Sequence, residues 1–222
     1  MCIRDSSTAE AKGTDAGTYD MGLNAKQFTN TNTNFTSVTF VISTDGKLEI
    51  KPRNVTLTSA SDEKVYDGTP LTKPDVTVTG DGFVTGEATN IKATGTITDV
   101  GTVTNTIAFA KGEKFKDSNY ALTKTEGTLE VTKREVTLTS ASDSKVYDGT
   151  ALTNGTVNVG GKGFAKDEGA TYDVTGTITN VGTTENAFTY TLKDNTKAEN
   201  YEITEEPVSY THLRAHETLR HL

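Results

Sequence analysis

The residue types that most often carry catalysis and metal binding are scarce in this sequence. Its 222 residues include three histidines and one cysteine, and all four lie close to a chain end, at Cys2, His212, His216 and His221. His212 and His216 could chelate zinc on a helix, but three residues separate Glu217 from His221 where the His-Glu-x-x-His motif has two. Between its two ends the sequence has no histidine or cysteine, and therefore no Ser-His-Asp or Cys-His system there. We expect a protein that is not an enzyme.

Carboxylates are the remaining candidates for acid–base chemistry or for calcium. Asp81 and Glu87 could pair for sugar hydrolysis, but Lys162 replaces Asp81 in a second copy of the segment. The acids that could hold calcium lie near two turns. The first set is Asp62, Glu63 and Asp67. The second set is Asp143, Ser144 and Asp148, in which a serine replaces one of the acids. Neither group has EF-hand spacing. We expect solvated acids and no cofactor, with calcium left as an alternative.

A covalent cross-link is a further alternative. An isopeptide bond between a lysine and an asparagine would suit a chain that does not rely on disulfides. The repeated candidates are Lys64 and Lys145 with Asn119 and Asn200. Sequence alone does not show whether these side chains are close together, so this alternative stays open.

The most distinctive segment is Lys-Val-Tyr-Asp-Gly-Thr, at 64–69 and again at 145–150. We interpret it as a structural corner, in which the aspartate accepts backbone hydrogen bonds, the glycine adopts a positive φ and the tyrosine ring enters the core. The alternative is a surface groove that binds glycan or protein, lined by Tyr66, Asp67, Tyr147 and Asp148. No tryptophan is present to build a sugar-binding platform, which favours the corner.

Internal repetition organises the chain. The segment VTLTSASDEKVYDGTPLT at 55–72 recurs at 136–153 with 16 of 18 positions identical and an offset of 81 residues. The same offset relates Gly-Phe at 82–83 to 163–164 and Asn-Tyr at 119–120 to 200–201. A period of this length indicates tandem domains.

We predict four segments from this repetition. Residues 1–52 hold an artefactual start followed by the back half of a preceding copy, and 53–133 are a complete copy. Residues 134–207 are a copy without its last strand, and 208–222 are a non-native tail, which is either disordered or an unrelated stub. MCIRDS at the start and VSYTHLRAHETLRHL at the end share nothing with the repeat and resemble translated sequencing-adapter sequence. We therefore expect a fragment of a longer array.

Alternation of apolar and polar residues predicts β-strands. It occurs in NVTLTSA at 54–60, DVTVTG at 75–80 and TLEVTK at 128–133, and period two with Val, Ile and Thr is typical of half-buried strands. Asp-Gly and Gly-x-Gly groups between them supply turns. The predicted fold is all-β, with small antiparallel β-sandwich-like repeat domains of about 81 residues joined end to end.

The inward face changes where one copy meets the next. Leu129 and Val131 occupy odd positions, whereas Val136 and Leu138 occupy even ones. Since a one-residue slip exchanges the two faces of a strand, we expect the flanking strands to serve two separate cores joined by a stiff connector, as in a semi-rigid rod.

Composition limits the kinds of partner and location that the chain can have. The chain carries 22 Lys and Arg against 30 Asp and Glu, a net charge of -8, so nucleic acid is an unfavourable partner. Threonine makes up 44 of the 222 residues. No apolar run is long enough to span a membrane, and we expect no membrane insertion within this chain.

The KVYDGT element, followed by Gly-Phe, Val-Gly-Thr, Asn-Tyr and a closing GxLxV strand, resembles the YDG and MBG (mostly β, glycine-rich) repeat domains of bacterial surface proteins and adhesins. The resemblance covers about Asp15 to Glu206. It implies a non-catalytic stalk of a Gram-positive surface protein, extracellular on the cell surface, which presents an adhesive region away from the wall and is attached to the wall outside this chain. The alternative is that each repeat is itself an adhesion module for glycan or for a host or microbial surface protein.

Overall fold

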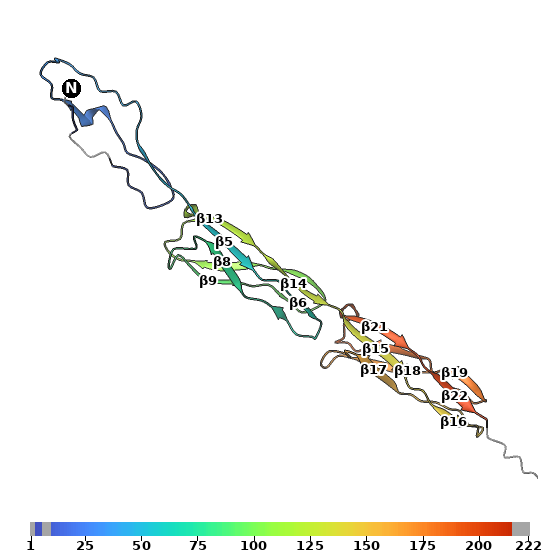
Figure 1. The fold of residues 1–222 in the computed structure, drawn as a ribbon. Coiled ribbons are helices and arrows are strands. Elements are labelled where there is room, and N and C mark those ends of the chain that lie inside the picture. The colour runs from blue at the N-terminus through green and yellow to red at the C-terminus, as the bar shows by residue number, and fades with distance from the viewer. Residues whose placement is uncertain (1–2, 6–9, 215–222) are drawn as a thin grey trace, which may run out of the picture. The chain divides into compact units, whose positions relative to one another are not determined.

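The computed structural model describes residues 3–5 and 10–214 (Figure 1). Apart from three single-turn 3-10 helices, η1 (Ala25–Gln27), η2 (Asp117–Asn119) and η3 (Ala198–Asn200), the regular elements of these residues are β-strands. The all-β class predicted from alternation is therefore confirmed. No helix in the described part of the chain is long and apolar enough to cross a membrane.

Two compact units make up the chain. The first contains residues 1–60, 74–94 and 106–127, and the second contains 61–73, 95–105 and 128–222. The division runs through the sequence copy at 53–133, so that the compact units do not coincide with the sequence copies. Whether 53–133 folds without its neighbours stays a prediction.

A mixed three-stranded sheet is the largest sheet of the first unit. Its order is β13–β5–β8, formed by Tyr120–Thr125, Arg53–Ser59 and Val76–Gly80 (Figure 1). β13 runs parallel to β5, and β8 runs antiparallel to it. The two-stranded sheets of this unit are β12 (Ile107–Lys111) with β9 (Ala88–Ala93), β2 (Gly17–Asp20) with β4 (Lys47–Ile50), and β1 (Ile3–Asp5) with β3 (Phe28–Asn30).

The core of the first unit follows the predicted alternation. Val55 and Leu57, two residues apart on β5, are fully buried with Ile107 and Tyr120. Phenylalanine rings, among them Phe115, which stacks on Tyr120 at 5.0 Å between ring centroids, close this cluster. Ring packing of this kind stabilises a small core beyond the area that it buries.

The second unit repeats the mixed sheet. Its order is β17–β15–β21, formed by Val157–Gly161, Arg134–Ser140 and Tyr201–Glu206, with β15 parallel to β21 and antiparallel to β17 (Figure 1). A second sheet has the order β16–β22–β19 (Ser144–Val146, Ser209–Leu213, Gly182–Glu185), and a third has the order β11–β14–β6 (Gly101–Asn105, Gly127–Thr132, Asp62–Val65). The two-stranded sheets are β18 (Ala170–Val174) with β20 (Phe188–Leu192), and β10 (Thr96–Ile97) with β7 (Leu71–Thr72).

The predicted antiparallel pairing describes only part of the sheets. Four strand pairs are parallel, namely β5 with β13, β6 with β14, β15 with β21, and β16 with β22. Alternation could not reveal this difference, because side chains alternate between the two faces of a strand in either direction of pairing. The early strands of a copy pair with its late strands, and no short turn marks such a connection.

The change of inward face is present, but the two separate cores are not. Leu129 and Val131 on β14 are buried, as are Val136 and Leu138 on β15. All four belong to one contiguous cluster, which also includes Tyr66. The expectation of independent cores is therefore wrong at this point of the second unit. Tyr66, Tyr201 and Phe188 belong to the same cluster as the inward side chains of both strands.

The expected absence of a last strand after residue 207 is also corrected. β22 pairs parallel with β16 and antiparallel with β19. Tyr210 and His212 are buried on it, 81 residues after Leu129 and Val131. The segment can take this place because its alternation points two large side chains inward. Residues 215–222 lie outside the described part, and the non-native origin of the tail stays a prediction.

Candidate functional site at the Tyr-Asp-Gly-Thr turn

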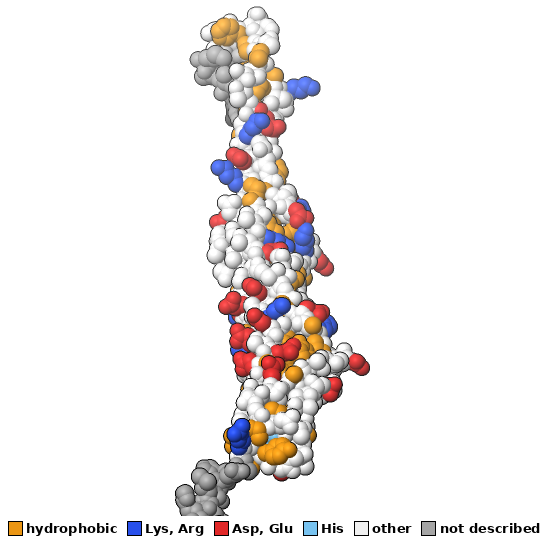
Figure 2. All heavy atoms as spheres, turned by 90° about the vertical axis from the view of Figure 1, so that its right-hand side faces the viewer, with side chains coloured by type: hydrophobic (Ala, Val, Ile, Leu, Met, Phe, Trp, Pro, Cys, Tyr) orange, Lys and Arg blue, Asp and Glu red, His pale blue; other side chains and the backbone are white. Residues whose placement is uncertain are grey.

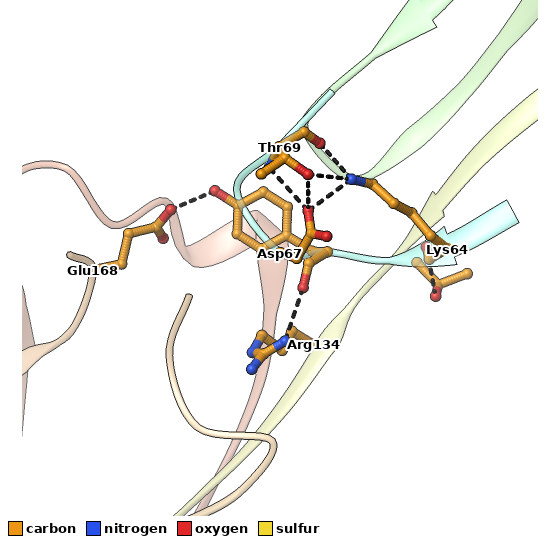
Figure 3. Close-up of polar contacts among 7 residues, drawn as sticks. Lys64, Asp67, Thr69, Arg134 and Glu168 are labelled. Carbon is orange, nitrogen blue, oxygen red and sulfur yellow. Dashed lines mark hydrogen bonds and ion pairs between the residues drawn. The ribbon is translucent and has the colours of Figure 1, made fainter. Parts of the chain in front are cut away.

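The turn that follows β6 is held by one carboxylate. Oδ1 of Asp67 accepts the backbone N–H of Thr69 at 2.9 Å, the Thr69 hydroxyl at 2.7 Å and the Lys64 ammonium at 2.7 Å (Figure 3). Gly68 has a φ of 80°, a conformation that glycine adopts without a steric penalty. Both backbone features expected of the corner are thus present.

The electrostatics of this turn favour the charged carboxylate. The hydrogen bond from Lys64 and, after it, the hydroxyl of Thr69 lower the pKa of Asp67 from 3.8 to about 2. The Asp67 side chain is 47% exposed. A half-exposed ion pair of this kind contributes little by itself, so the hydrogen bonds to the turn are its main structural role.

Tyr66 points away from solvent. Its side chain is 4% exposed, and its hydroxyl donates to Oε1 of Glu168 at 2.6 Å. Its ring meets Tyr201 edge to face, with ring centroids 5.5 Å apart, and its backbone oxygen accepts a hydrogen bond from Nη1 of Arg134 at 3.3 Å (Figure 3). Burial and the Glu168 carboxylate raise the pKa of Tyr66 to about 12.

The three residues that receive Tyr66 form a cradle, which we define as Arg134, Glu168 and Tyr201. Oε2 of Glu168 accepts the Tyr201 hydroxyl at 2.7 Å, while Oε1 accepts that of Tyr66. Nε of Arg134 donates to the Gly163 carbonyl at 2.6 Å. All three lie in the copy that follows Tyr66, 102 residues away in the case of Glu168.

The second copy of the turn has the same local geometry in another environment. Oδ1 of Asp148 accepts the backbone N–H of Thr150 at 2.9 Å and its hydroxyl at 2.8 Å, and Lys145 approaches to 3.0 Å. These contacts, led by the Thr150 backbone, hold the pKa of Asp148 well below its usual range. Tyr147, however, is 46% exposed, with its ring against His212 at 5.8 Å.

The predicted groove residues therefore separate. Asp67 and Asp148 each accept hydrogen bonds within the turn of their own copy. Tyr66 is buried, whereas Tyr147 is exposed. No repeated aromatic surface is formed by the two tyrosines, because one of them serves as core. Sequence reasoning missed the cradle residues; the offset of 81, which relates Glu168 to Glu87, was the signal that could have found them.

A second polar contact was also missed by sequence reasoning. Asp99 lies 2.5 Å from the Lys197 ammonium and accepts from Nδ2 of Asn200 at 2.8 Å, while Oδ1 of Asn200 accepts the Val100 N–H. In the first unit Asp15 makes the same contacts with Lys116 at 2.5 Å and Asn119 at 3.0 Å. The lysine contacts lower the pKa of both aspartates. The signal was the recurring Asp-x-Gly-Thr at 15–18 and 99–102.

The cross-link candidates are engaged elsewhere. The Lys64 ammonium bonds Asp67 and Thr69, and Lys145 bonds Asp148 and Thr150. The two asparagines bond the aspartates of the other polar contact. The structure thus places the lysines and asparagines in different hydrogen-bond networks.

The remaining candidates are not assembled into a site. Asp81 accepts the N–H of Asn54, and Glu87 accepts the Tyr120 hydroxyl. Among the residues that the structure describes, no three His, Cys, Asp or Glu side chains are grouped to hold a metal, and Asp62, Glu63 and Asp67 are therefore not such a group. His212 lies in a strand, so the helical spacing that would pair it with His216 is absent at this residue.

Comparison with known proteins gave no match: no family model, no curated protein and no solved structure resembles the chain closely enough to be recorded.

Proposed function

We propose that the chain is part of the non-catalytic stalk of a bacterial cell-surface protein, in which repeated β domains hold an adhesive region away from the cell wall. The observation that carries this proposal is the parallel pairing of early and late strands. β15 pairs with β21 from Arg134↔Tyr201 to Thr139↔Glu206, and β16 pairs with β22 over three positions.

Parallel pairing determines how the strands carry tension. A load that enters at the start of β15 and leaves at the end of β22 slides parallel neighbours past each other. The hydrogen bonds between them lie across the load and share it, whereas a hairpin pulled at its open end loses its bonds one after another. β5 and β13 in the first unit have the same parallel pairing over six positions. This arrangement suits a spacer under tension.

The exposed surface also supports a spacer. On the face seen in Figure 2, uncharged polar side chains and backbone dominate, and apolar patches are small. Lys and Arg side chains are scattered over this face, whereas many Asp and Glu side chains gather in one stretch of it. Large apolar patches are typical of interaction surfaces. The resemblance of the repeats to YDG and MBG domains supports an extracellular setting. The role requires no cofactor.

The alternative is an adhesion module for glycan or for a host or microbial surface protein. One observation favours it, the exposed ring of Tyr147 beside Asp148. Because its ring is not in the core, Tyr147→Ala should leave the chain folded and remove the ring from any such surface.

A binding screen separates the two functions. The full chain and Tyr147→Ala are tested against glycans and matrix proteins, with circular dichroism as the folding control. A stalk gives no saturable binding. Saturable binding that is lost in the folded variant would make the repeat an adhesion module and overturn the spacer proposal.

A further inference from the structure

One asparagine of the second unit has surroundings that favour the loss of its side-chain amide. The chain contains 14 asparagines, and only Asn154 is followed directly by glycine. Asparagine is a thermolabile residue, and glycine has no side chain to keep its backbone nitrogen away from the residue before it. The pair lies in the loop between the isolated bridge at Leu152 and the start of β17 at Val157.

The side chain of Asn154 is held in a position that exposes its carbonyl carbon to attack. Its Oδ1 accepts the backbone N–H of Thr156 at 3.1 Å, which folds the side chain back toward the Gly155 peptide. The same N–H can stabilise negative charge that develops on Oδ1, as the donors of an oxyanion hole do. Nδ2, the leaving group, has no hydrogen-bond partner in the described part of the chain.

The backbone nitrogen of Gly155 is free to act as the nucleophile. Its N–H has no hydrogen-bond partner among the described residues, and the residue is exposed. A Cβ added to Gly155 would meet no described atom within 4 Å. No neighbour therefore prevents the movement that brings this nitrogen to Cγ of Asn154.

The first copy offers a natural comparison. Lys73 and Pro74 occupy the corresponding places, 81 residues earlier. Lysine has no side-chain carbonyl and proline has no N–H, so the same chemistry is impossible there. The two loops are otherwise fixed alike: Nδ2 of Asn105 donates to the Lys73 carbonyl at 2.7 Å, and Nδ2 of Asn186 donates to that of Asn154 at 3.1 Å.

We propose that Asn154 is a site of spontaneous deamidation, which converts its amide to a carboxylate as the protein ages. The Gly155 nitrogen loses its proton to base and forms a bond to Cγ, and the bond from Cγ to Nδ2 breaks as ammonia leaves with a proton. Water then opens the succinimide ring at either carbonyl. Opening at Cγ gives aspartate, and opening at the backbone carbonyl gives isoaspartate. In total, one water is taken up and one ammonia is released.

Isoaspartate at this position disturbs a buried contact. The backbone oxygen of Asn154 accepts hydrogen bonds from Asn186, which is fully buried, and from the Tyr210 hydroxyl at 2.8 Å. In isoaspartate this oxygen belongs to a free carboxylate, and the main chain is one methylene longer. Because a charge against buried groups costs free energy, the modified second unit should unfold more readily. The inference is independent of the stalk proposal, since it concerns the chemistry of one loop.

The test is a time course of the full chain at mildly alkaline pH, followed by digestion and mass spectrometry. Deamidation raises the mass of a fragment by about one dalton, whereas isomerisation of the Asp-Gly pairs leaves it unchanged. Asn32 is the internal control, because its Oδ1 accepts the Asn34 N–H at 2.9 Å but its next residue is Thr33. Asn154 should react about tenfold faster or more, since a β-branched neighbour hinders the attack. The rate should rise with pH, because the attacking nitrogen must lose its proton.

Gly155→Val is the matched variant. Gly155 does not have a positive φ, and space is open at its Cβ position, so the variant should keep the circular dichroism spectrum of the parent chain. Its Asn154 should deamidate about tenfold more slowly or less. The isoaspartate form of the parent chain, separated by ion exchange, should unfold at a lower urea concentration than the unmodified form.

Three results would overturn the inference. Conversion of Asn154 that is no faster than that of Asn32 would show that the loop does not favour the reaction. An unchanged rate in folded Gly155→Val would exclude the Gly155 nitrogen as the nucleophile. Equal urea midpoints for the isoaspartate and unmodified forms would remove the stated effect on the second unit.

Discussion

The same six residues, Lys-Val-Tyr-Asp-Gly-Thr, form the same turn twice, but the environment of the tyrosine differs between the two copies. Tyr66 is buried against Glu168 and Tyr201, whereas Tyr147 is 46% exposed. The aspartate and glycine act within the turn, so their role is local. The tyrosine acts between copies, so its role depends on a partner surface.

This difference gives the first prediction. Tyr66→Ala removes a buried ring and leaves Glu168 without one of its donors, which should lower the free energy of unfolding by about 3–5 kcal/mol. Tyr147→Ala is the matched control and should cost less than about 1 kcal/mol. Urea unfolding of the two full-length variants measures both values. Equal losses would contradict the assignment of Tyr66 to the core.

The second prediction concerns acid. The pKa of Asp67 is lowered to about 2 in the folded chain, so its stabilising effect is complete above about pH 4 and is lost as the pH falls through 2. Asp67→Asn should therefore cost about 0.5–1 kcal/mol at pH 6 and less at pH 2.

Urea unfolding at the two pH values tests this prediction. Lys64→Met is a useful companion, because it removes the first cause of the lowered pKa and should weaken the pH dependence. A cost of Asp67→Asn that is the same at pH 6 and pH 2 would show that the Asp67 carboxylate does not act through its charge.

The turn could be predicted because its hydrogen bonds are local. The cradle could not be predicted in this way. An Asp followed by Gly and Thr specifies its own hydrogen bonds within three residues. Glu168 lies 102 residues from Tyr66, and no local rule connects them. Only the repeat offset, applied to every polar residue, could have indicated that Glu87 and Glu168 share a role.

At the scale of elements, β22 shows how little sequence identity a strand needs. Ser209–Leu213 shares no motif with Gly127–Thr132, yet it takes the corresponding place beside β16 and β19. Alternation suffices, because it directs Tyr210 and His212 inward. The fit is imperfect: neither ring nitrogen of the buried His212 has a hydrogen-bond partner among the described residues.

The third prediction follows from that imperfection. His212→Val restores the residue type of Val131 and removes two buried polar atoms, each of which costs about 1–3 kcal/mol when unsatisfied. Stability should rise by about 1–3 kcal/mol, even though the ring contact with Tyr147 is lost. Thr211→Val, on the other face of β22, is the control and should change stability by less than about 0.5 kcal/mol. A destabilised His212→Val would argue against β22 as a native-like strand.

The strands themselves were the most predictable part of the fold. Val, Ile and Thr at period two located β5, β8, β14 and β15. The predicted inward faces of β5, β14 and β15 are buried, whereas Val78 on β8 is 38% exposed. Strand direction and partners could not be predicted, because they depend on contacts between residues about 67 positions apart, such as Tyr120 with Arg53. Short turns suggested hairpins, while the central pairs are formed at long range.

At the scale of the whole molecule, the chain uses one kind of polar joint twice. Asp15 with Lys116 and Asn119 in the first unit matches Asp99 with Lys197 and Asn200 in the second. Each joint links an Asp-x-Gly-Thr loop to the next copy along the chain. A repeated joint of this kind, together with the parallel strand pairs within each unit, fits the spacer that we propose.

The measurement that tests this account most directly is the unfolding force of the second unit pulled in two directions. Cys2→Ser removes the one cysteine of the chain, and introduced cysteine pairs then provide attachment points at exposed residues. Lys133→Cys with Arg214→Cys loads the parallel pairs β15–β21 and β16–β22 in shear. Lys133→Cys with Lys162→Cys pulls the antiparallel strands β15 and β17 apart from one end. We predict a clearly higher unfolding force for the first pair. Equal forces, or a lower force in shear, would contradict the proposal that this chain is a load-bearing stalk.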